Sequence, residues 1–373
     1  MTGSSGGGLP ADDRETRFER LDRLLAARGL ASVWLARPDG FAWLTGGSNV
    51  VDGYADVGVA AAGYDGDELV VVTDNIEAER LAAEEIPACR VERYDWHAGS
   101  LGEAVADVAP TPAGADFAVA ADGFERVEVS GCRRPLTPGD LERYREAGRA
   151  TAAAVEAACR ACDPDDTEQA VAADLRARLA ARGLEAPVVL VGGGERAPRY
   201  RHLTPTDARL GEYAVVSVTT RDRGLYSSCT RTVAFDPPAW LHDRHRAAAR
   251  VETTVLAATA RNGPDGTAAP VFEAVREAYA ALDHTGEWRE HHQGGAAGYA
   301  GREWFLAPGS DATLDLPMAY AYNPTVEGAK SEDTVLVTGD GFETLTDTGD
   351  WPTEPFDAVG SGTTLARPTV LDR

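Results

Sequence analysis

The chain has 373 residues, and its 36 Lys plus Arg against 60 Asp plus Glu give a formal net charge of −24 at pH 7. This acidic balance excludes a binder of nucleic acid, which needs a basic face toward the phosphates, and it excludes an anionic membrane surface as partner. With 43% hydrophobic and 26% charged residues the composition is that of a globular protein, and the length suggests about two domains.

The basic residues are almost all of one kind. Lys330 is the only lysine, so every other basic side chain counted above is an arginine. A strongly acidic, nearly lysine-free composition is typical of proteins from salt-loving organisms, in which dense carboxylates keep the surface hydrated despite screening. A GC-rich genome that favours arginine codons is a second, compatible explanation. In both cases the charge reflects solubility and environment rather than chemistry.

The beginning of the chain and its cysteines indicate a cytoplasmic protein. Residues 1–13 are rich in Gly and Ser and uncharged before their acidic end, which predicts a disordered tail rather than a secretory signal or transit peptide. The longest apolar runs are far too short to span a bilayer. The five cysteines, an odd number, suit reduced thiols. Cys159 and Cys162 form a CxxC motif, but its Ala-rich helical surroundings offer no partner ligands, so we expect no zinc there.

The first part of the chain alternates between helical and strand-like segments. Apolar residues at helical spacing predict a helix over 14–28, and a strand-like segment at 32–36 is followed by a second apolar segment at 41–45. A buried strand is predicted at 68–73, and a helix that begins near Asp74 is predicted over 75–85. This alternation predicts a compact α/β domain over 14–134.

A turn-and-cap signature at 136–140, Leu-Thr-Pro-Gly-Asp, marks the start of a second domain, predicted over 135–373. The helices predicted in it cover 141–162, 167–182, 241–260 and 270–281. The strands predicted in it cover 187–191, 213–219, 224–235, 316–323 and 333–337. Because helices and strands come in runs rather than in strict alternation, the larger domain is predicted to be α+β.

Three polar clusters accompany the predicted strands of the second domain. A strand at 224–232 is dense in hydroxyls, and a segment at 290–298 pairs two histidines with small residues. A charged stretch at 330–333 leads into an apolar strand. Each has an ordinary explanation: a half-exposed strand, a solvated histidine pair, and charge at a hairpin. His202 likewise lies in a loop with ordinary reasons to hold a histidine.

The order and context of these clusters resemble those of the creatinase/aminopeptidase P/prolidase superfamily. Residues 211–216, the trio Thr230-Arg231-Thr232, and the segment 332–337 followed by Gly341 and 345–346 match its motifs, and the resemblance covers about residues 14–350. It implies a small N-terminal α/β domain of the creatinase type followed by a catalytic-type domain with the pita-bread fold. It also implies a homodimer.

The resemblance also places the five metal ligands of the family's peptidases, which are Asp, Asp, His, Glu and Glu. In this chain the corresponding positions carry Ser217, Ser228, Gly295, Asn323 and Glu332. Serine and glycine do not hold a divalent cation, and one carboxylate does not replace four lost ligands. We therefore expect no metal site and no cofactor.

The non-metal part of the family's pocket is retained. The resemblance assigns catalytic roles to His202, His291 and Glu332, with a histidine paired to Glu332 and so held in one tautomer. Substrate-binding roles fall on Ser228, Arg231, Arg302, Glu303, Asn323 and Lys330. A nucleophilic role for Ser228 or Cys229 is less favoured, since alternation along a strand points these two side chains to opposite faces.

Three functions are consistent with this pattern. The first is metal-independent hydrolysis of a C–N bond in a small nitrogenous or peptide-like substrate, as in creatinase, the metal-free member of the superfamily. The second is a catalytically inert pita-bread protein used for binding or regulation. The third is an Xaa-Pro aminopeptidase or dipeptidase with an atypical metal site. In each case the expected partner is a small molecule or peptide.

Overall fold

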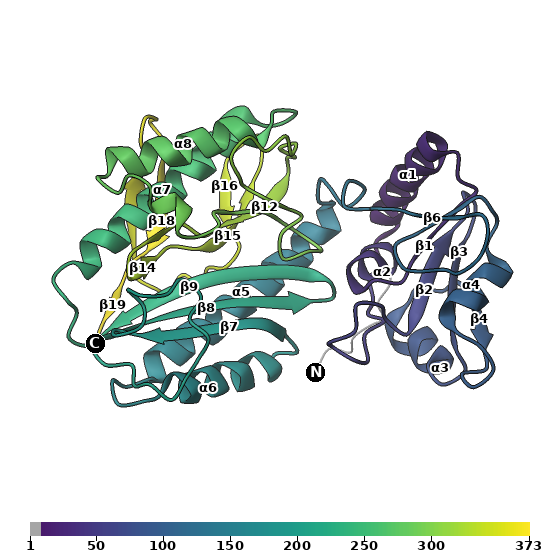
Figure 1. The fold of residues 1–373 in the computed structure, drawn as a ribbon, viewed down its shortest axis with the longest axis horizontal. Coiled ribbons are helices and arrows are strands. Elements are labelled where there is room, and N and C mark those ends of the chain that lie inside the picture. The colour runs from purple at the N-terminus through teal and green to yellow at the C-terminus, as the bar shows by residue number, and fades with distance from the viewer. Residues whose placement is uncertain (1–8) are drawn as a thin grey trace. The chain divides into compact units, whose positions relative to one another are not determined.

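The computed structural model describes residues 9–373, which divide between Asp140 and Leu141 into two compact units (Figure 1). The predicted boundary at 134/135 lies shortly before this division. Residues 1–8 of the predicted tail lie outside the described residues, and Ala11–Asp13 already belong to helix α1 (Ala11–Arg28). Within residues 9–373, no helix is both long and apolar enough to cross a membrane.

The first unit is built on a six-stranded mixed sheet with the order β4-β3-β2-β1-β5-β6. Its strands are β1 (Ser32–Leu35), β2 (Ala60–Tyr64), β3 (Leu69–Asp74), β4 (Arg90–Tyr94), β5 (Ala113–Ala115) and β6 (Phe124–Arg126). Every residue of β1 is buried, as the apolar run that follows Ser32 predicts for a central strand. Trp34 packs with Val105 of helix α4 (Leu101–Val108) in the core of this unit.

Two predicted elements of the first unit have a different form in the structure. The apolar segment 41–45 belongs to helix α2 (Pro38–Thr45) and not to a strand, because Pro38 provides the first helical residue and Gly46 ends the helix in the left-handed conformation. The helix predicted over 75–85 begins later, as α3 (Ala78–Arg80) followed by a π-helical turn, η1 (Leu81–Glu85). Asp74 caps this region by accepting hydrogen bonds from two following backbone N–H groups.

The helices of the second unit lie close to their predicted positions. They are α5 (Pro138–Ala161, which begins at the end of the first unit), α6 (Glu168–Ala180), α7 (Leu241–Asn262) and α8 (Ala268–Ala281). The signature at 136–140 does start α5: Thr137 Oγ1 accepts from the Asp140 N–H at 3.3 Å, and Asp140 Oδ2 accepts from the Thr137 N–H at 3.1 Å. This reciprocal pair satisfies backbone donors that a helix start leaves unpaired.

Two sheets form the rest of the second unit, which confirms the α+β class (Figure 1). A four-stranded sheet has the order β19-β9-β8-β7, with β7 (Glu185–Gly193), β8 (Tyr213–Asp222), β9 (Leu225–Ala234) and β19 (Leu371–Asp372). A five-stranded antiparallel sheet has the order β11-β10-β12-β15-β16, with β10 (Gly294–Ala297), β11 (Trp304–Phe305), β12 (Met318–Tyr322), β15 (Asp333–Val337) and β16 (Phe342–Thr344). Two-stranded ribbons pair β13 (Thr325–Val326) with β14 (Ala329–Lys330) and β17 (Thr353–Asp357) with β18 (Thr364–Pro368).

The two faces of the β7–β9 sheet have different surroundings. Val216, Val218 and Cys229 point into an apolar core shared with α5 and α6, which also takes Cys159 and Cys162. Burial there raises the pKa of the Cys159 thiol well above its usual range, as suits an inert core cysteine. The alternate residues of β8 and β9 face the opposite side, toward the five-stranded sheet. Ser228 and Cys229 therefore point apart, as predicted.

Candidate functional site

A cavity of about 270 Å³ lies on the hydroxyl-bearing side of β8 in the second unit. Six of the nine predicted site residues line it: His202, His291, Arg302, Asn323, Lys330 and Glu332. They come from five separate places in the chain: the β7–β8 loop, the segment before β10, the β10–β11 loop, the end of β12, and the β14–β15 region. Antiparallel pairing of β10 with β12 and of β12 with β15 brings these segments together.

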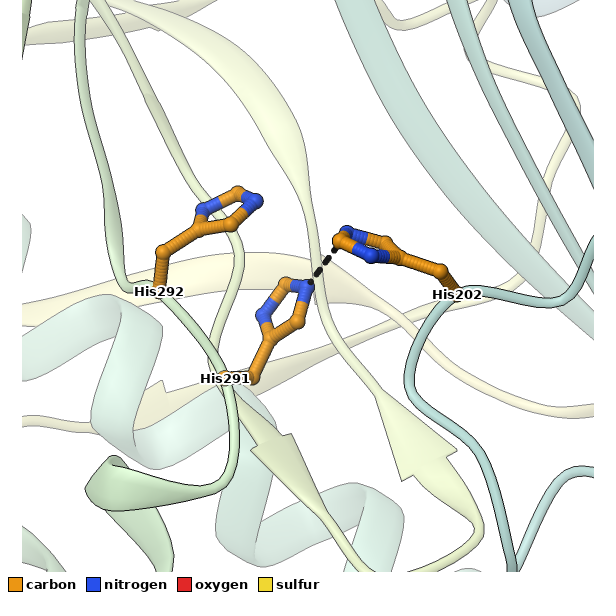
Figure 2. Close-up of side chains that lie close together, drawn as sticks. All are labelled: His202, His291 and His292. Atoms are coloured by element: carbon orange, nitrogen blue, oxygen red, sulfur yellow. Dashed lines mark hydrogen bonds between the residues drawn. The ribbon is translucent and has the colours of Figure 1, made fainter.

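Three histidines gather at this cavity (Figure 2). His202 Nε2 and His291 Nε2 are 3.3 Å apart, a hydrogen bond whose donor depends on the tautomers. His292 stacks on His291 with ring centroids 4.2 Å apart and meets Phe305 edge-on. One ring nitrogen from each histidine lies within 4.8 Å of those of the other two. His202 and His291 were each predicted as site residues, and the structure brings them together with His292.

Burial and neighbouring cations keep two of these rings neutral. Burial lowers the pKa of His291 to about 2, assisted by the charge of Lys330. Burial and the charge of Arg302 lower the pKa of His292 to about 4. Both imidazoles are therefore neutral at physiological pH, with one nitrogen protonated and the other carrying a lone pair. Among the described residues, no hydrogen-bond partner faces Nδ1 of His291.

Glu332 holds two cations in the wall of the cavity. Its Oε2 is 2.7 Å from Lys330 Nζ and accepts a hydrogen bond from Thr230 Oγ1 at 2.8 Å, and its Oε1 is 3.1 Å from Arg302 Nη2. The expected pairing of Glu332 with a histidine is therefore wrong, because the carboxylate is engaged by stronger, charged donors. Burial alone would raise the pKa of Glu332, but the charges of Lys330 and Arg302 outweigh it and hold that pKa below its usual range.

Three predicted site residues lie outside the cavity lining. Arg231 is buried in the wall behind it, where its guanidinium donates to Asp333 Oδ1 at 2.9 Å and to the Thr346 carbonyl at 2.8 Å. This placement favours a structural role over the expected contact with substrate. Ser228 lies just behind the lining, where its Oγ accepts from Arg302 Nη1 at 3.4 Å. Glu303 Oε1 accepts from the Ala300 N–H at 3.1 Å and so closes the turn between β10 and β11.

The sequence reasoning missed His292, Tyr226 and Phe305, which also line the cavity. His292 had a visible signal, because it stands beside His291 just before a run of small residues. The segment before β10 has no strand periodicity, so nothing local indicates that both adjacent rings face the same space. Tyr226 and Phe305 look like ordinary strand residues in sequence.

The two units of the chain each match a domain that is known from peptidase-like hydrolases. Residues 17–149 match the creatinase/prolidase N-terminal domain, and residues 142–339 match metallopeptidase family M24. The chain therefore belongs to metallopeptidase family M24, which confirms the predicted creatinase-type domain followed by a pita-bread domain.

Similar proteins carry peptidase names. An Xaa-Pro dipeptidase from Lactobacillus helveticus is 26% identical over 223 residues, a match that covers 57% of this chain and 60% of that relative, less than two thirds of its length. Dipeptidase PepE from Mycobacterium ulcerans superposes with a TM-score of 0.72 at 20% identity, over 98% of this chain and 100% of that one. An Xaa-Pro dipeptidase from Bacillus anthracis gives 0.71 at 18% identity, over 93% and 100%.

The residues at the five implied metal positions do not fit a carboxylate-bound pair of metal ions. Ser217 Oγ shares a hydrogen bond of 2.7 Å with Thr230 Oγ1 and receives Lys330 Nζ at 3.4 Å. A Cβ at Gly295 would come within 2.0 Å of the Trp304 carbonyl oxygen, so this position has no room for a ligand side chain. Glu332, the one carboxylate among the five, is already paired with two cations. Two-metal sites need several anionic oxygen ligands, which this donor set does not supply.

Proposed function

We propose that the protein hydrolyses a C–N bond in a small nitrogenous or peptide-like substrate that carries a carboxylate, with no metal ion in the catalytic step. The observation that carries this proposal is the contact between His202 and His291 in a cavity where Glu332, the one carboxylate at the implied metal positions, is paired with Lys330 and Arg302. A histidine can move a proton between water and a leaving nitrogen without help from a metal.

The charge of the cavity supports an anionic substrate group. Lys330 and Arg302 against Glu332 leave one positive charge in excess, and the histidines beside them are neutral or exposed. Arg302 donates through Nη1 to the Gly301 carbonyl and through Nη2 to Glu332, whereas its buried Nε meets no partner among the described residues. A planar, permanently charged guanidinium in the lining of the cavity suits a carboxylate, which accepts several N–H bonds at once.

His202 has the position of a general base. It borders the cavity and is fixed on one side by His291, whose neutral ring sets which His202 nitrogen carries the proton. His202 would take a proton from water as the water oxygen bonds to the carbon of the C–N group. It would then give that proton to the nitrogen as the C–N bond breaks, which releases an amine and leaves His202 as it began. Glu332 acts by holding Lys330 and Arg302 in place.

A second candidate is Xaa-Pro dipeptide hydrolysis with a rearranged metal site, favoured by the names of the relatives above. The two candidates differ in their need for metal, and share a peptide-like substrate. We also propose a homodimer, supported by the resemblance, and a cytoplasmic location, supported by five cysteines that are all free thiols in the described part of the chain.

The test combines turnover with metal analysis. Dipeptides, N-acyl amino acids and amidino acids are offered to the purified protein before and after treatment with a chelator, and its metal content is measured. Turnover should survive chelation, and His202→Ala should lower kcat by about 10²–10⁴-fold, the range for loss of a general base. His242→Ala, on the exposed side of α7, is the matched control and should keep full activity.

Two results would overturn the proposal. Turnover that is lost on chelation and restored by added Mn²⁺ or Co²⁺ would support the Xaa-Pro dipeptidase instead. Absence of turnover for every substrate class, with ligands that raise the thermal transition temperature, would show a binding protein.

A further inference from the structure

We propose that His202, His291 and His292 together bind one divalent transition-metal ion of the zinc type, at a place distinct from the five carboxylate-type positions discussed above. His292 is the residue that makes this site, because the other two histidines alone offer only two ligands. Binding at this site does not depend on the proposed function; only its effect on turnover does.

The spacing of the ring nitrogens carries the proposal (Figure 2). Two nitrogens bound to one tetrahedral zinc at about 2.0–2.1 Å lie about 3.3–3.4 Å apart. His202 Nε2 and His291 Nε2 are 3.3 Å apart, so this pair already has the spacing of two ligands. One ring nitrogen from each histidine lies within 4.8 Å of those of the other two, so a shift of about 1.4 Å brings the most distant of these nitrogens to ligand spacing. His202 and His292 each keep part of their surface exposed to solvent, which favours such a side-chain movement.

The surroundings of His292 support its role as a ligand. Its Nδ1 is 3.5 Å from Asn323 Nδ2, and the Oδ1 of the same amide is buried with no hydrogen-bond partner among the described residues. A half-turn of the Asn323 amide places that oxygen where it accepts from a protonated Nδ1 of His292. This leaves Nε2 of His292 with its lone pair. Metal-bound histidines ordinarily donate their second nitrogen to an oxygen in this way.

The chemistry of the site selects the ion. Three imidazoles suit zinc, copper or nickel, whereas magnesium and calcium prefer oxygen ligands. Three protein ligands leave a fourth position, which here faces the cavity. Lys330 and Arg302 stand near the cluster and oppose a cation, and Glu332 offsets one of their two charges. The site therefore relies on ligand bonds rather than on attraction between charges.

A metal ion at this site would inhibit the proposed hydrolysis. In the hydrolysis, Nε2 of His202 contacts His291 and Nδ1 carries the lone pair that accepts the proton from water. A metal ion on Nε2 would leave the ring proton on Nδ1, and His202 would then have no free lone pair for the water. The cluster therefore offers two exclusive uses, proton transfer or metal binding. This consequence rests on the proposed function, whereas the metal site itself does not.

Direct titration tests the site. Chelator-treated, dialysed protein is titrated with ZnCl₂ by calorimetry, and with Co²⁺ by the visible absorption bands of a tetrahedral, histidine-rich centre. We expect one ion per chain with a Kd of about 1 μM or below. His292→Phe keeps the stacking on His291 and removes the nitrogen, and should weaken binding by at least about 100-fold, the upper end of what losing even an outer-shell partner costs. His242→Asn is the matched control and should bind like the parent.

The outcomes separate this inference from the proposed function. Failure to bind one Zn²⁺ per chain, or equal affinity in the parent and in both His292→Phe and His202→Asn, overturns the metal site whatever the turnover assays show. Circular dichroism of each variant shows whether it is folded. Stoichiometric binding together with inhibition supports both proposals. Stoichiometric binding with activation supports the metal site and overturns the metal-free mechanism.

Discussion

Replacing Glu332 with Gln tests whether this carboxylate stabilises a cluster of charges or acts as a metal ligand. The substitution keeps the shape of the side chain but removes the one negative charge that contacts Lys330 and Arg302 within residues 9–373, and both cations are almost fully buried. One amide nitrogen would then face one of these cations. Removing one member of a buried ion pair costs about 3–5 kcal/mol, because the partner is left charged without compensation. Here two partners are left, so we expect at least the lower end of this range.

Thermal unfolding of the second unit measures this effect. For a unit of this size 1 kcal/mol shifts the transition temperature by about 2–4 °C, so Glu332→Gln should lower it by about 6–20 °C. The loss should be the same with and without chelator. Glu343→Gln is the matched control, because its ion pair with Arg145 is nearly half exposed on both sides and should contribute less than about 1 kcal/mol.

The dependence of stability on pH below neutrality is a second test of the same cluster. The pKa of Glu332 is lowered in the folded state, so its contribution to stability is present above the unfolded pKa and is lost as the pH falls through the folded one. Glu332→Gln should therefore approach the parent in stability at low pH. A variant within about 1 kcal/mol of the parent at neutral pH, or one that loses stability only when metal is present, would refute the charge-cluster reasoning.

Three further predictions follow from other residues. Burial raises the pKa of Asp116 to about 6, so the free energy of unfolding of the first unit should fall by up to about 3 kcal/mol between pH 4 and pH 7. Asp116→Asn should remove this fall. A variant whose free energy of unfolding, measured by urea titration, still falls with pH as in the parent would contradict the prediction. Gly295→Ala should lower the stability of the second unit by about 1–3 kcal/mol, since its Cβ would meet the Trp304 carbonyl, whereas Gly339→Ala, with open space around it, should be neutral in the same melt. Lys330→Met should tighten Zn²⁺ binding severalfold in calorimetry, because it removes a neighbouring positive charge, and weaker binding would count against the metal site.

The main elements of the second unit were predictable because local and long-range preferences agree there. The strands at 213–219 and 333–337 are rich in valine, which favours strands. The long helix starts at a capping pair that can be read in Thr137 and Asp140. Short strands such as Gly294–Ala297 were not predicted. Gly and Ala give no strand preference, so these residues become a strand only because neighbouring strands of the sheet pair with them.

The site was predictable to the extent that it follows the family resemblance. The resemblance identified six lining residues, but it assigned Arg231 to the substrate. The alternation of side chains along β9 predicts the place of Arg231 better than the resemblance does. Arg231 lies an odd number of residues from Ser228 and so points to the opposite face of the sheet. The pairing of Lys330 with Glu332 also has a local signal, because residues two apart in an extended segment share a side. Convergence of His202 with His291 and His292 has no local signal, since it depends on how distant loops meet.

The position of Lys330 has a practical consequence for studying this protein by chemical labelling. As the only lysine in the chain, it carries the only side-chain amine, and this residue lies in the cavity wall with 8% of its surface exposed. An amine-directed reagent small enough to enter would therefore report on one known site, apart from the chain's α-amino group. Protection of that single position, followed by mass spectrometry, would screen compound libraries for occupants of the cavity and would need no activity assay.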